Sequence, residues 1–126
     1  MEITTDPTNK EFGDYAEEIA AQEYLKKGYA ILERKWRHGK SEIDLVVQKD
    51  NIIAFVEVKA RNGRGMMPFE SITHDKRRRM AKAADSYIRR QKGDFDYRFD
   101  FVGLTGNPED YEIEVLEDAF LATDFH

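Results

Sequence analysis

The sequence predicts a single α/β domain, residues 1–126, built around a mixed β-sheet. Two segments space their apolar residues as amphipathic helices do, and five short segments show the apolar or alternating patterns of strands. Glycine, asparagine and proline separate these segments. The predicted order is helix, three strands, helix, two strands (αβββαββ), at residues 8–27, 29–37, 41–48, 52–61, 73–91, 97–104 and 111–117.

The first predicted helix has recognisable ends. Thr8 and Glu11 fit a capping box, and Asp6–Pro7 offers an alternative start. Gly28 is placed to end the helix in a left-handed conformation. The apolar face comprises Phe12, Ala16, Ile19 and Ala20.

The remaining elements are bounded in the same way. Gly39 marks the turn before the strand at 41–48, and Asn62–Gly65 forms a loop after the strand at 52–61. Thr73 is a plausible N-cap of the second helix, with Gly93 as its stop. Gly106–Pro108 turns the chain between the last two strands. The core stripe of the second helix is Met80, Ala84, Tyr87 and Ile88.

Composition excludes some chemistries and leaves a polyanion partner open. The chain has no cysteine, which excludes disulfides, zinc–thiolate sites and cysteine nucleophiles. Its net charge is −5, yet the charged residues of the segment 76–92 are all basic except for Asp85, and residues 105–126 contain no lysine or arginine. Segregated charge of this kind can steer a nucleic acid to one face. The N-terminus is polar, and the longest apolar run, Ile52–Val56, is too short to span a bilayer. These two features predict a cytoplasmic protein with no membrane partner.

The strongest signal lies in the strands 41–48 and 52–61. A hairpin with a two-residue turn at Asp50–Asn51 places Asp44 opposite Glu57 and Glu42 opposite Lys59. In this register one face is uniformly apolar, whereas a one-residue slip would mix the faces. The apolar face comprises Ile43, Leu45, Val47, Ala54, Val56, Val58 and Ala60.

Opposed carboxylates need a compensating charge. Directly opposed side chains have Cβ atoms roughly 4.5–5.5 Å apart, so Asp44 and Glu57 repel each other unless a divalent cation binds both. Lys59 lies on the same face and could orient a water molecule or stabilise charge on a phosphate. Two acids, a lysine and a metal ion can hydrolyse a phosphodiester. The alternative is an ordinary charged surface in which Glu42 and Lys59 form a cross-strand pair.

In combination these motifs resemble the PD-(D/E)xK superfamily, whose members have a restriction-endonuclease-like core. More closely, the chain resembles the YraN family of endonuclease-like proteins, which is similar to archaeal Holliday junction resolvases. The resemblance extends from about Gly13 to Phe120, and Ser41 departs from it where the family usually has glycine. The matching segments are Gly13–Glu17 with Ala20, Ser41–Val46, Phe55–Arg61, Lys76 and Arg98–Phe101.

The resemblance implies a role for individual residues. Asp44 and Glu57 would bind Mg²⁺ (or Mn²⁺) with the Val58 carbonyl, and Lys59 would be the catalytic lysine. Glu17 matches a helix-borne acid that approaches the metal through water. Lys76 matches a polar position near the site. The implied activity is hydrolysis of DNA, with branched or structured DNA as a candidate substrate. Because resolvase relatives act as dimers, the resemblance also implies a homodimer as a candidate assembly.

Other charged residues have two interpretations each. Lys76 and its neighbours Arg77, Arg78 and Arg79 are either a solvated helix face or, as we favour, phosphate contacts, and Arg61 is a further candidate contact with nucleic acid. By its pattern alone, Glu17 reads as a solvated helix residue. Asp100 more plausibly supports packing or orients a basic residue than acts in catalysis. The rival function is a nucleic-acid-binding module of the same fold that does not cleave.

Overall fold

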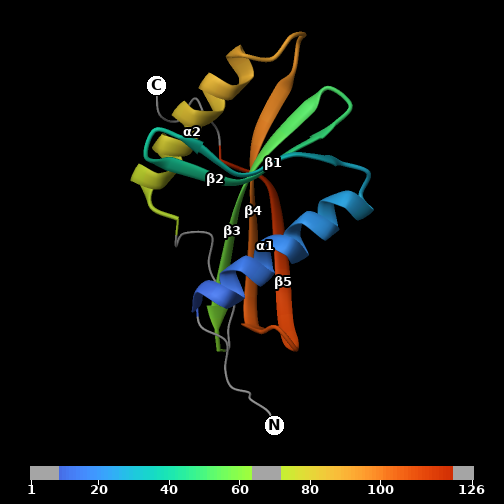
Figure 1. Ribbon diagram of the computed structural model, residues 1–126, viewed down its shortest axis with the longest axis vertical. Coiled ribbons are helices and arrows are strands. Elements are labelled where there is room, and N and C mark those ends of the chain that lie inside the picture. The colour runs from blue at the N-terminus through green and yellow to red at the C-terminus, as the bar shows by residue number, and fades with distance from the viewer. Residues whose placement is uncertain (1–8, 64–71, 121–126) are drawn as a thin grey trace.

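A computed structural model describes residues 9–63 and 72–120, and Figure 1 shows its seven elements. They follow the order that the sequence predicts: α1 (Asn9–Lys26), β1 (Ala30–His38), β2 (Ser41–Lys49), β3 (Ile52–Asn62), α2 (His74–Arg89), β4 (Asp96–Asn107) and β5 (Asp110–Phe120). The α/β class is therefore confirmed. The predicted capping residue Thr8 and the alternative start Asp6–Pro7 lie outside the described residues, as do Arg64 and Gly65 of the predicted loop.

The five strands form one mixed sheet in sequential order, β1-β2-β3-β4-β5. Only β3 and β4 are parallel, and the other neighbours are antiparallel. Parallel neighbours need a crossover connection, which here contains α2. In Figure 1, α1 crosses the lower part of β3, β4 and β5, whereas α2 lies beside the β1–β2 hairpin.

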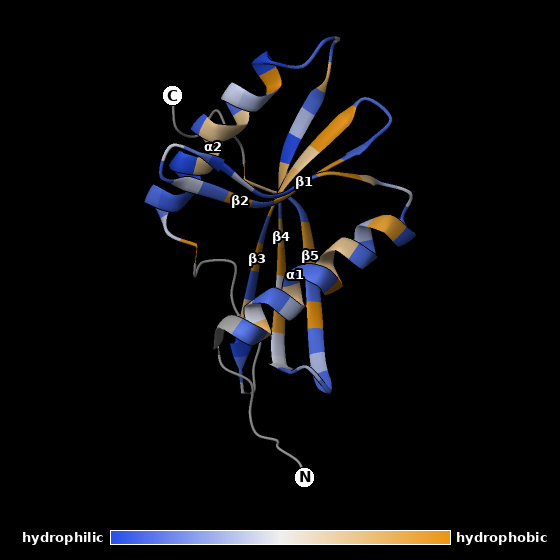
Figure 2. Cartoon of the chain, in the orientation of Figure 1, coloured by the Kyte–Doolittle hydropathy of each residue, from blue (hydrophilic) through white to orange (hydrophobic). Residues whose placement is uncertain are grey.

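Each face of the sheet has its own hydrophobic core. On one face, α1 packs Phe12, Ala16 and Tyr24 against alternate residues of β2, β3 and β4. On the other, α2 packs Met80 and Ala84 against the intervening residues. Figure 2 shows the resulting pattern, with orange stretches along the central strands and mixed colours on both helices. The sheet is thus covered by a helix on either side. This packing holds in place the strands that carry the charged residues of the candidate site.

The ends of α2 agree only in part with the sequence. Thr73 is the N-cap, because its hydroxyl accepts a hydrogen bond from the Lys76 N–H at 3.1 Å. The helix stops at Arg89, with Arg90 as its C-cap, so the predicted end at residue 91 was too late. Gly93 follows with a φ of +107°, in the loop rather than at the cap.

The final hairpin is longer than predicted. β4 and β5 pair as far as Asn107 and Asp110, so the turn is at 108–109 and Gly106 belongs to β4. The Asn107 side chain accepts hydrogen bonds from the backbone N–H groups of Glu109 and Asp110, both at 2.9 Å. Gly106 has a φ of +121°, and a side chain there would collide with the Asp110 carbonyl.

Asp100 anchors a buried polar network on the α1 face. Its carboxylate accepts hydrogen bonds from Arg98 Nε at 2.9 Å and from the Tyr24 hydroxyl at 2.7 Å. It also accepts one from the Asp118 N–H at 3.0 Å, which bridges the irregularity between β4 and β5. Asp100 is 1% exposed, so these donors are what make its charge tolerable. The contacts agree with the role that the sequence analysis preferred for this residue, which is to support packing or to orient a basic residue, here Arg98.

We predict that Asp100→Ala lowers the free energy of unfolding by about 3–5 kcal/mol, because it leaves the Arg98 guanidinium without its buried partner. Chemical denaturation would measure the change. The control is Asp75→Ala, which removes the exposed partner of Arg78 and should leave the free energy of unfolding almost unchanged. Equal losses for the two variants would show that the Asp100 network does not carry this stability.

Candidate metal and nucleic-acid site

The site forms where β2 separates from β3. The predicted register is confirmed for five pairs, from Lys49–Ile52 to Leu45–Val56. The ladder then ends, so the predicted strand pairing of Asp44 with Glu57, and of Glu42 with Lys59, is not formed. Instead, the Val58 N–H donates a hydrogen bond to Asp44 Oδ2 at 2.7 Å. A side-chain carboxylate has taken the place of a strand partner.

Where the ladder ends, the face that Ile43 occupies also changes. The sequence analysis placed Ile43 on one apolar face with Leu45, but Ile43 packs in the α2-side core and Leu45 in the α1-side core. The prediction was wrong because strict alternation fails at Asp44. The opposite face, with Val46 and Phe55, is core as well, because α2 covers it.

Asp44 and Glu57 meet despite the lost pairing. Glu57 is only 3% exposed. Burial is the main reason that the pKa of Asp44 rises to about 7, and the neighbouring Glu57 carboxylate raises it further. The Val58 N–H and the Lys76 ammonium oppose this rise. A buried carboxylate pair of this kind favours either a shared proton or a cation.

Two lysines flank Glu57 from different elements. Lys59 Nζ lies 3.5 Å from Glu57 Oε2, and Lys76 Nζ lies 3.7 Å from Oε1. Lys76 reaches the site from the first turn of α2 and also lies 3.4 Å from the Glu42 carbonyl. Glu57 Oε1 nevertheless accepts no hydrogen bond from any residue that the structure describes. One oxygen of a buried carboxylate is therefore available to a further ligand.

Glu17 joins the cluster from α1. Its pKa is raised chiefly by burial and also by Asp44, while the Lys35 ammonium, 2.8 Å from Oε1, lowers it. The Glu17 side chain is 19% exposed. It is thus a half-buried member of the site rather than the solvated helix residue that its pattern alone suggested.

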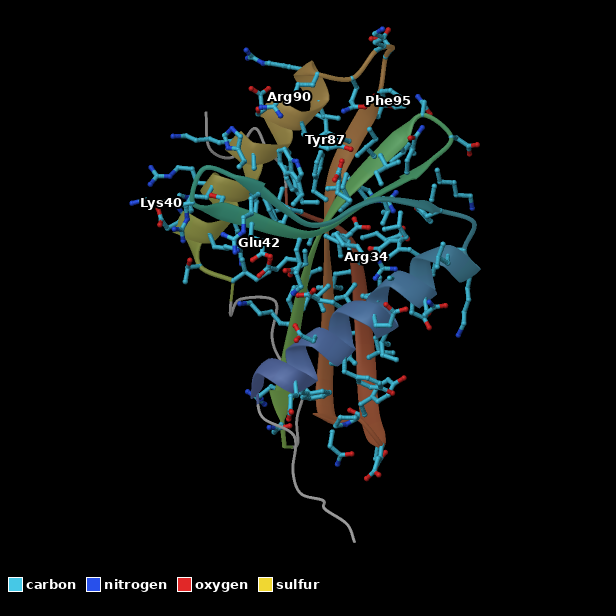
Figure 3. All side chains as sticks on the ribbon, viewed as in Figure 1. Arg34, Lys40, Glu42, Tyr87, Arg90 and Phe95 are labelled. Carbon is cyan, nitrogen blue, oxygen red and sulfur yellow. The ribbon has the colours of Figure 1, made fainter. Side chains whose placement is uncertain are left out.

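Glu42 lies at the rim. Its carboxylate is 4.0 Å from Arg37 on β1, its registered neighbour, whereas the Lys59 ammonium lies beside Glu57. The alternative of a Glu42–Lys59 surface pair is therefore not what the structure shows. Figure 3 places Glu42 on the β1–β2 hairpin next to the start of α2, with Lys40 at the hairpin's end.

The predicted nucleic-acid contacts differ in their exposure and in their partners. The Arg77 guanidinium lies 6.0 Å from the Phe120 ring centroid, half-buried. Arg78 and Arg79 are exposed and share Asp75, at 2.7 and 3.5 Å. Arg61 is exposed near the end of β3, two residues beyond Lys59. Lys76 places its charge at the carboxylates, 3.7 Å from Glu57 Oε1.

Few groups at the site are placed to coordinate a metal ion. Within residues 9–63 and 72–120, no three histidine, cysteine, aspartate or glutamate side chains are arranged to hold an ion. The available donors are Asp44, Glu57 and the Val58 carbonyl, which points to the same strand edge as the Val58 N–H. Mg²⁺ is commonly held by one or two carboxylates with water and phosphate oxygens, so this set fits it.

A groove on the α1 side shares Glu17 and Glu42 with the site. It has a volume of about 420 Å³ and is lined by charged residues of α1, β1 and β2. The lining comprises Asp14, Glu17, Glu18, Arg34, Lys35, Arg37, Glu42 and Leu45. Sequence reasoning missed Lys35, because nothing in the pattern of β1 distinguishes it from the other basic residues of that strand.

Comparison with known proteins places the chain in a family. Residues 16–104 match the family described as "Uncharacterised protein family UPF0102". A UPF0102 protein of Phocaeicola vulgatus is 39% identical over 113 residues, which cover 89% of this chain and 93% of the relative. The chain belongs to the UPF0102 family. The predicted YraN membership is confirmed, because that family is UPF0102.

Other UPF0102 proteins match over similar lengths. One from Chloroherpeton thalassium is 40% identical over 123 residues, covering 90% of this chain and 95% of the relative. One from Clostridium perfringens is 37% identical over 116 residues, covering 89% and 95%. The family match spans Glu17, Asp44, Glu57, Lys59 and Lys76, and it ends within β4. Neither described helix is long and apolar enough to cross a membrane.

We predict that the metal-free protein loses stability as the pH rises from about 4 to 7. In this window Asp44 ionises readily in the unfolded chain but holds its proton in the folded one, because its folded pKa is about 7. Asp44→Asn should flatten this dependence. At pH 8 its free energy of unfolding should exceed that of wild type by about 1–2 kcal/mol. Urea titrations with a chelator at pH 5 and pH 8 would measure it. A wild type that is equally stable at both pH values would contradict the raised pKa.

Proposed function

We propose that this UPF0102 protein is a metal-dependent endonuclease that hydrolyses DNA phosphodiester bonds, with its centre at Asp44 and Glu57. One observation carries the proposal. Glu57 Oε1 is buried beside a second carboxylate and accepts no hydrogen bond from the described residues. Such an arrangement costs stability, and a site that binds a cation offsets that cost.

The donor set suits a hard divalent cation. Carboxylate and carbonyl oxygens are the ligands that Mg²⁺ and Mn²⁺ prefer, and the chain supplies them through Asp44, Glu57 and Val58. When bound, such an ion would supply Lewis acidity and lower the pKa of a water molecule. Glu17 interacts with Asp44 and keeps part of its side chain exposed, so its carboxylate can accept a hydrogen bond from water beside the proposed centre.

The lysines complete the proposed centre. Lys59 keeps its ammonium 3.5 Å from Glu57 while its side chain is 42% exposed, so it can contact a phosphate that approaches from solvent. There it would stabilise the charge that develops during attack on the phosphorus atom. Lys76 adds a second positive charge from α2, beside the other oxygen of Glu57.

The rest of α2 provides positioning contacts. Arg78 and Arg79 project from the turn that follows Lys76 and are exposed, so a nucleic acid at the centre could exchange their Asp75 partner for phosphates. The resemblance to restriction-endonuclease-like enzymes and Holliday junction resolvases supports DNA as the substrate. From the same resemblance we propose that the substrate is branched DNA and that the protein acts as a homodimer.

A second candidate is a module that binds nucleic acid without cleaving it. The observation that favours it is the position of Lys59 and Lys76, whose ammonium groups both lie within 4 Å of Glu57. Two lysines can balance the carboxylates in place of a cation. In that case the basic residues of α2 would bind phosphates and the centre would be structural.

We predict that the purified protein cleaves DNA in the presence of Mg²⁺ or Mn²⁺, tested across duplex, flap and four-way-junction substrates. Lys59→Ala should lower the cleavage rate by about 100-fold or more, because it removes a charge that acts on the reacting phosphate. DNA affinity should change little, since other residues supply most of the positioning contacts. Gel-based cleavage and binding assays would separate the two effects.

The control is Lys26→Ala, which removes an exposed lysine at the end of α1 whose partner is Glu23. It should cleave like wild type. A folded wild-type protein that binds DNA and Mn²⁺ but cuts no substrate would support the non-cleaving module. A protein that binds no nucleic acid at low salt would contradict both candidates.

We also predict that Arg78→Gln combined with Arg79→Gln weakens DNA binding regardless of sequence and lowers the slope of log affinity against log salt by up to about 2. Fluorescence anisotropy at several salt concentrations would measure the slope. The matched control is Arg89→Gln with Arg90→Gln, at the other end of α2. Equal effects from both pairs would indicate a diffuse surface rather than contacts beside the site.

A further inference from the structure

Lys35 has an unusual backbone for a residue within a strand. Its φ is +49°, in the left-handed region, which costs an ordinary side chain roughly 1–2 kcal/mol. Lys35 and Asp44 are also skipped by the β1–β2 register, between the pairs Arg34–Leu45 and Trp36–Ile43. The strained residue thus lies across from the point where β2 leaves β3.

The strained backbone delivers the Lys35 ammonium to the acidic cluster. Its Nζ lies 2.8 Å from Glu17 Oε1 and 3.4 Å from Asp14 Oδ1. Glu17 in turn faces Asp44, whose neighbour is Glu57. Lys35 is therefore the counter-ion at the Glu17 end of a row of three carboxylates, whereas Lys59 and Lys76 flank Glu57 at the other end.

We propose that Lys35 is a positioning residue that holds Glu17 at the site while no divalent cation is bound, and that cation binding displaces its ammonium. This inference rests on the proposed metal site and adds a residue that competes with the metal. A cation held by Asp44 and Glu57 would repel the ammonium and attract the Glu17 carboxylate. The Lys35 side chain is 51% exposed, so it can swing into solvent at little cost.

The neighbouring Arg34 offers a matched control. It lies on the same strand, its side chain is 49% exposed, and it forms a 2.9 Å ion pair with a residue of α1. Its partner is Glu18, which is exposed and lies outside the carboxylate row. Removing either cation changes the net charge equally, but only Lys35 is coupled to Glu17.

The experiment is a calorimetric titration of the full chain with Mn²⁺ at constant ionic strength. Lys35→Asn should tighten Mn²⁺ binding by roughly three- to tenfold, because it removes the competing charge. Asparagine tolerates a positive φ, so this variant keeps the backbone conformation. Lys35→Arg keeps the charge and should bind Mn²⁺ as wild type does. Arg34→Gln should change the affinity less than about twofold, since its charge lies on an exposed pair.

Coupling through Glu17 is tested by a double-mutant cycle. Glu17→Gln should weaken Mn²⁺ binding. In that background, Lys35→Asn should no longer tighten Mn²⁺ binding. If Lys35→Asn and Arg34→Gln alter affinity equally while Asp44→Asn abolishes binding, the metal site stands and the role of Lys35 is overturned. If wild type binds no Mn²⁺ at all, the proposed metal site and this inference fail together.

Discussion

The hydrogen bond from the Val58 N–H to Asp44 Oδ2 allows β2 and β3 to separate inside the protein. A strand that leaves its neighbour exposes backbone groups that must find other partners when they are buried. Asp44 supplies that partner at 2.7 Å, so the sheet can open without an unpaired N–H at this point. The same bond fixes the Asp44 carboxylate beside Glu57. The opening of the sheet and the acidic centre are therefore one structural feature.

Charge balance then decides what surrounds this centre. Glu17, Asp44 and Glu57 come from α1, β2 and β3, and Lys35, Lys59 and Lys76 come from β1, β3 and α2. Each helix thus contributes a charged group to a cluster that no single element could form. The two hydrophobic cores hold the helices on opposite faces of the sheet and so keep these groups in register. The Asp100 network has a separate task, since it ties α1 and β5 to β4 on the α1 face.

Membership of the UPF0102 family covers the residues from which the site is built, and the β4–β5 hairpin continues beyond the matched range. The structure adds an arrangement to that membership. A buried carboxylate with an available oxygen, a second acid with a raised pKa and two adjacent lysines are compatible with metal-assisted phosphodiester hydrolysis. The same lysines are also the observation behind the non-cleaving alternative. Cleavage of DNA is therefore the property on which the two functions differ.

The sequence by itself determined the order of the elements, the Thr73 cap and the register of β2 with β3 over five pairs, because these depend on local patterns and on one short turn. It also indicated Asp44, Glu57 and Lys59 as neighbours. Tertiary structure alone decided that the ladder ends at Leu45–Val56, that Ile43 turns to the α2 side and that Lys35 adopts a left-handed conformation. Alternation assumes a regular strand, whereas these three features arise where contacts with α1, α2 and β1 outweigh local preference.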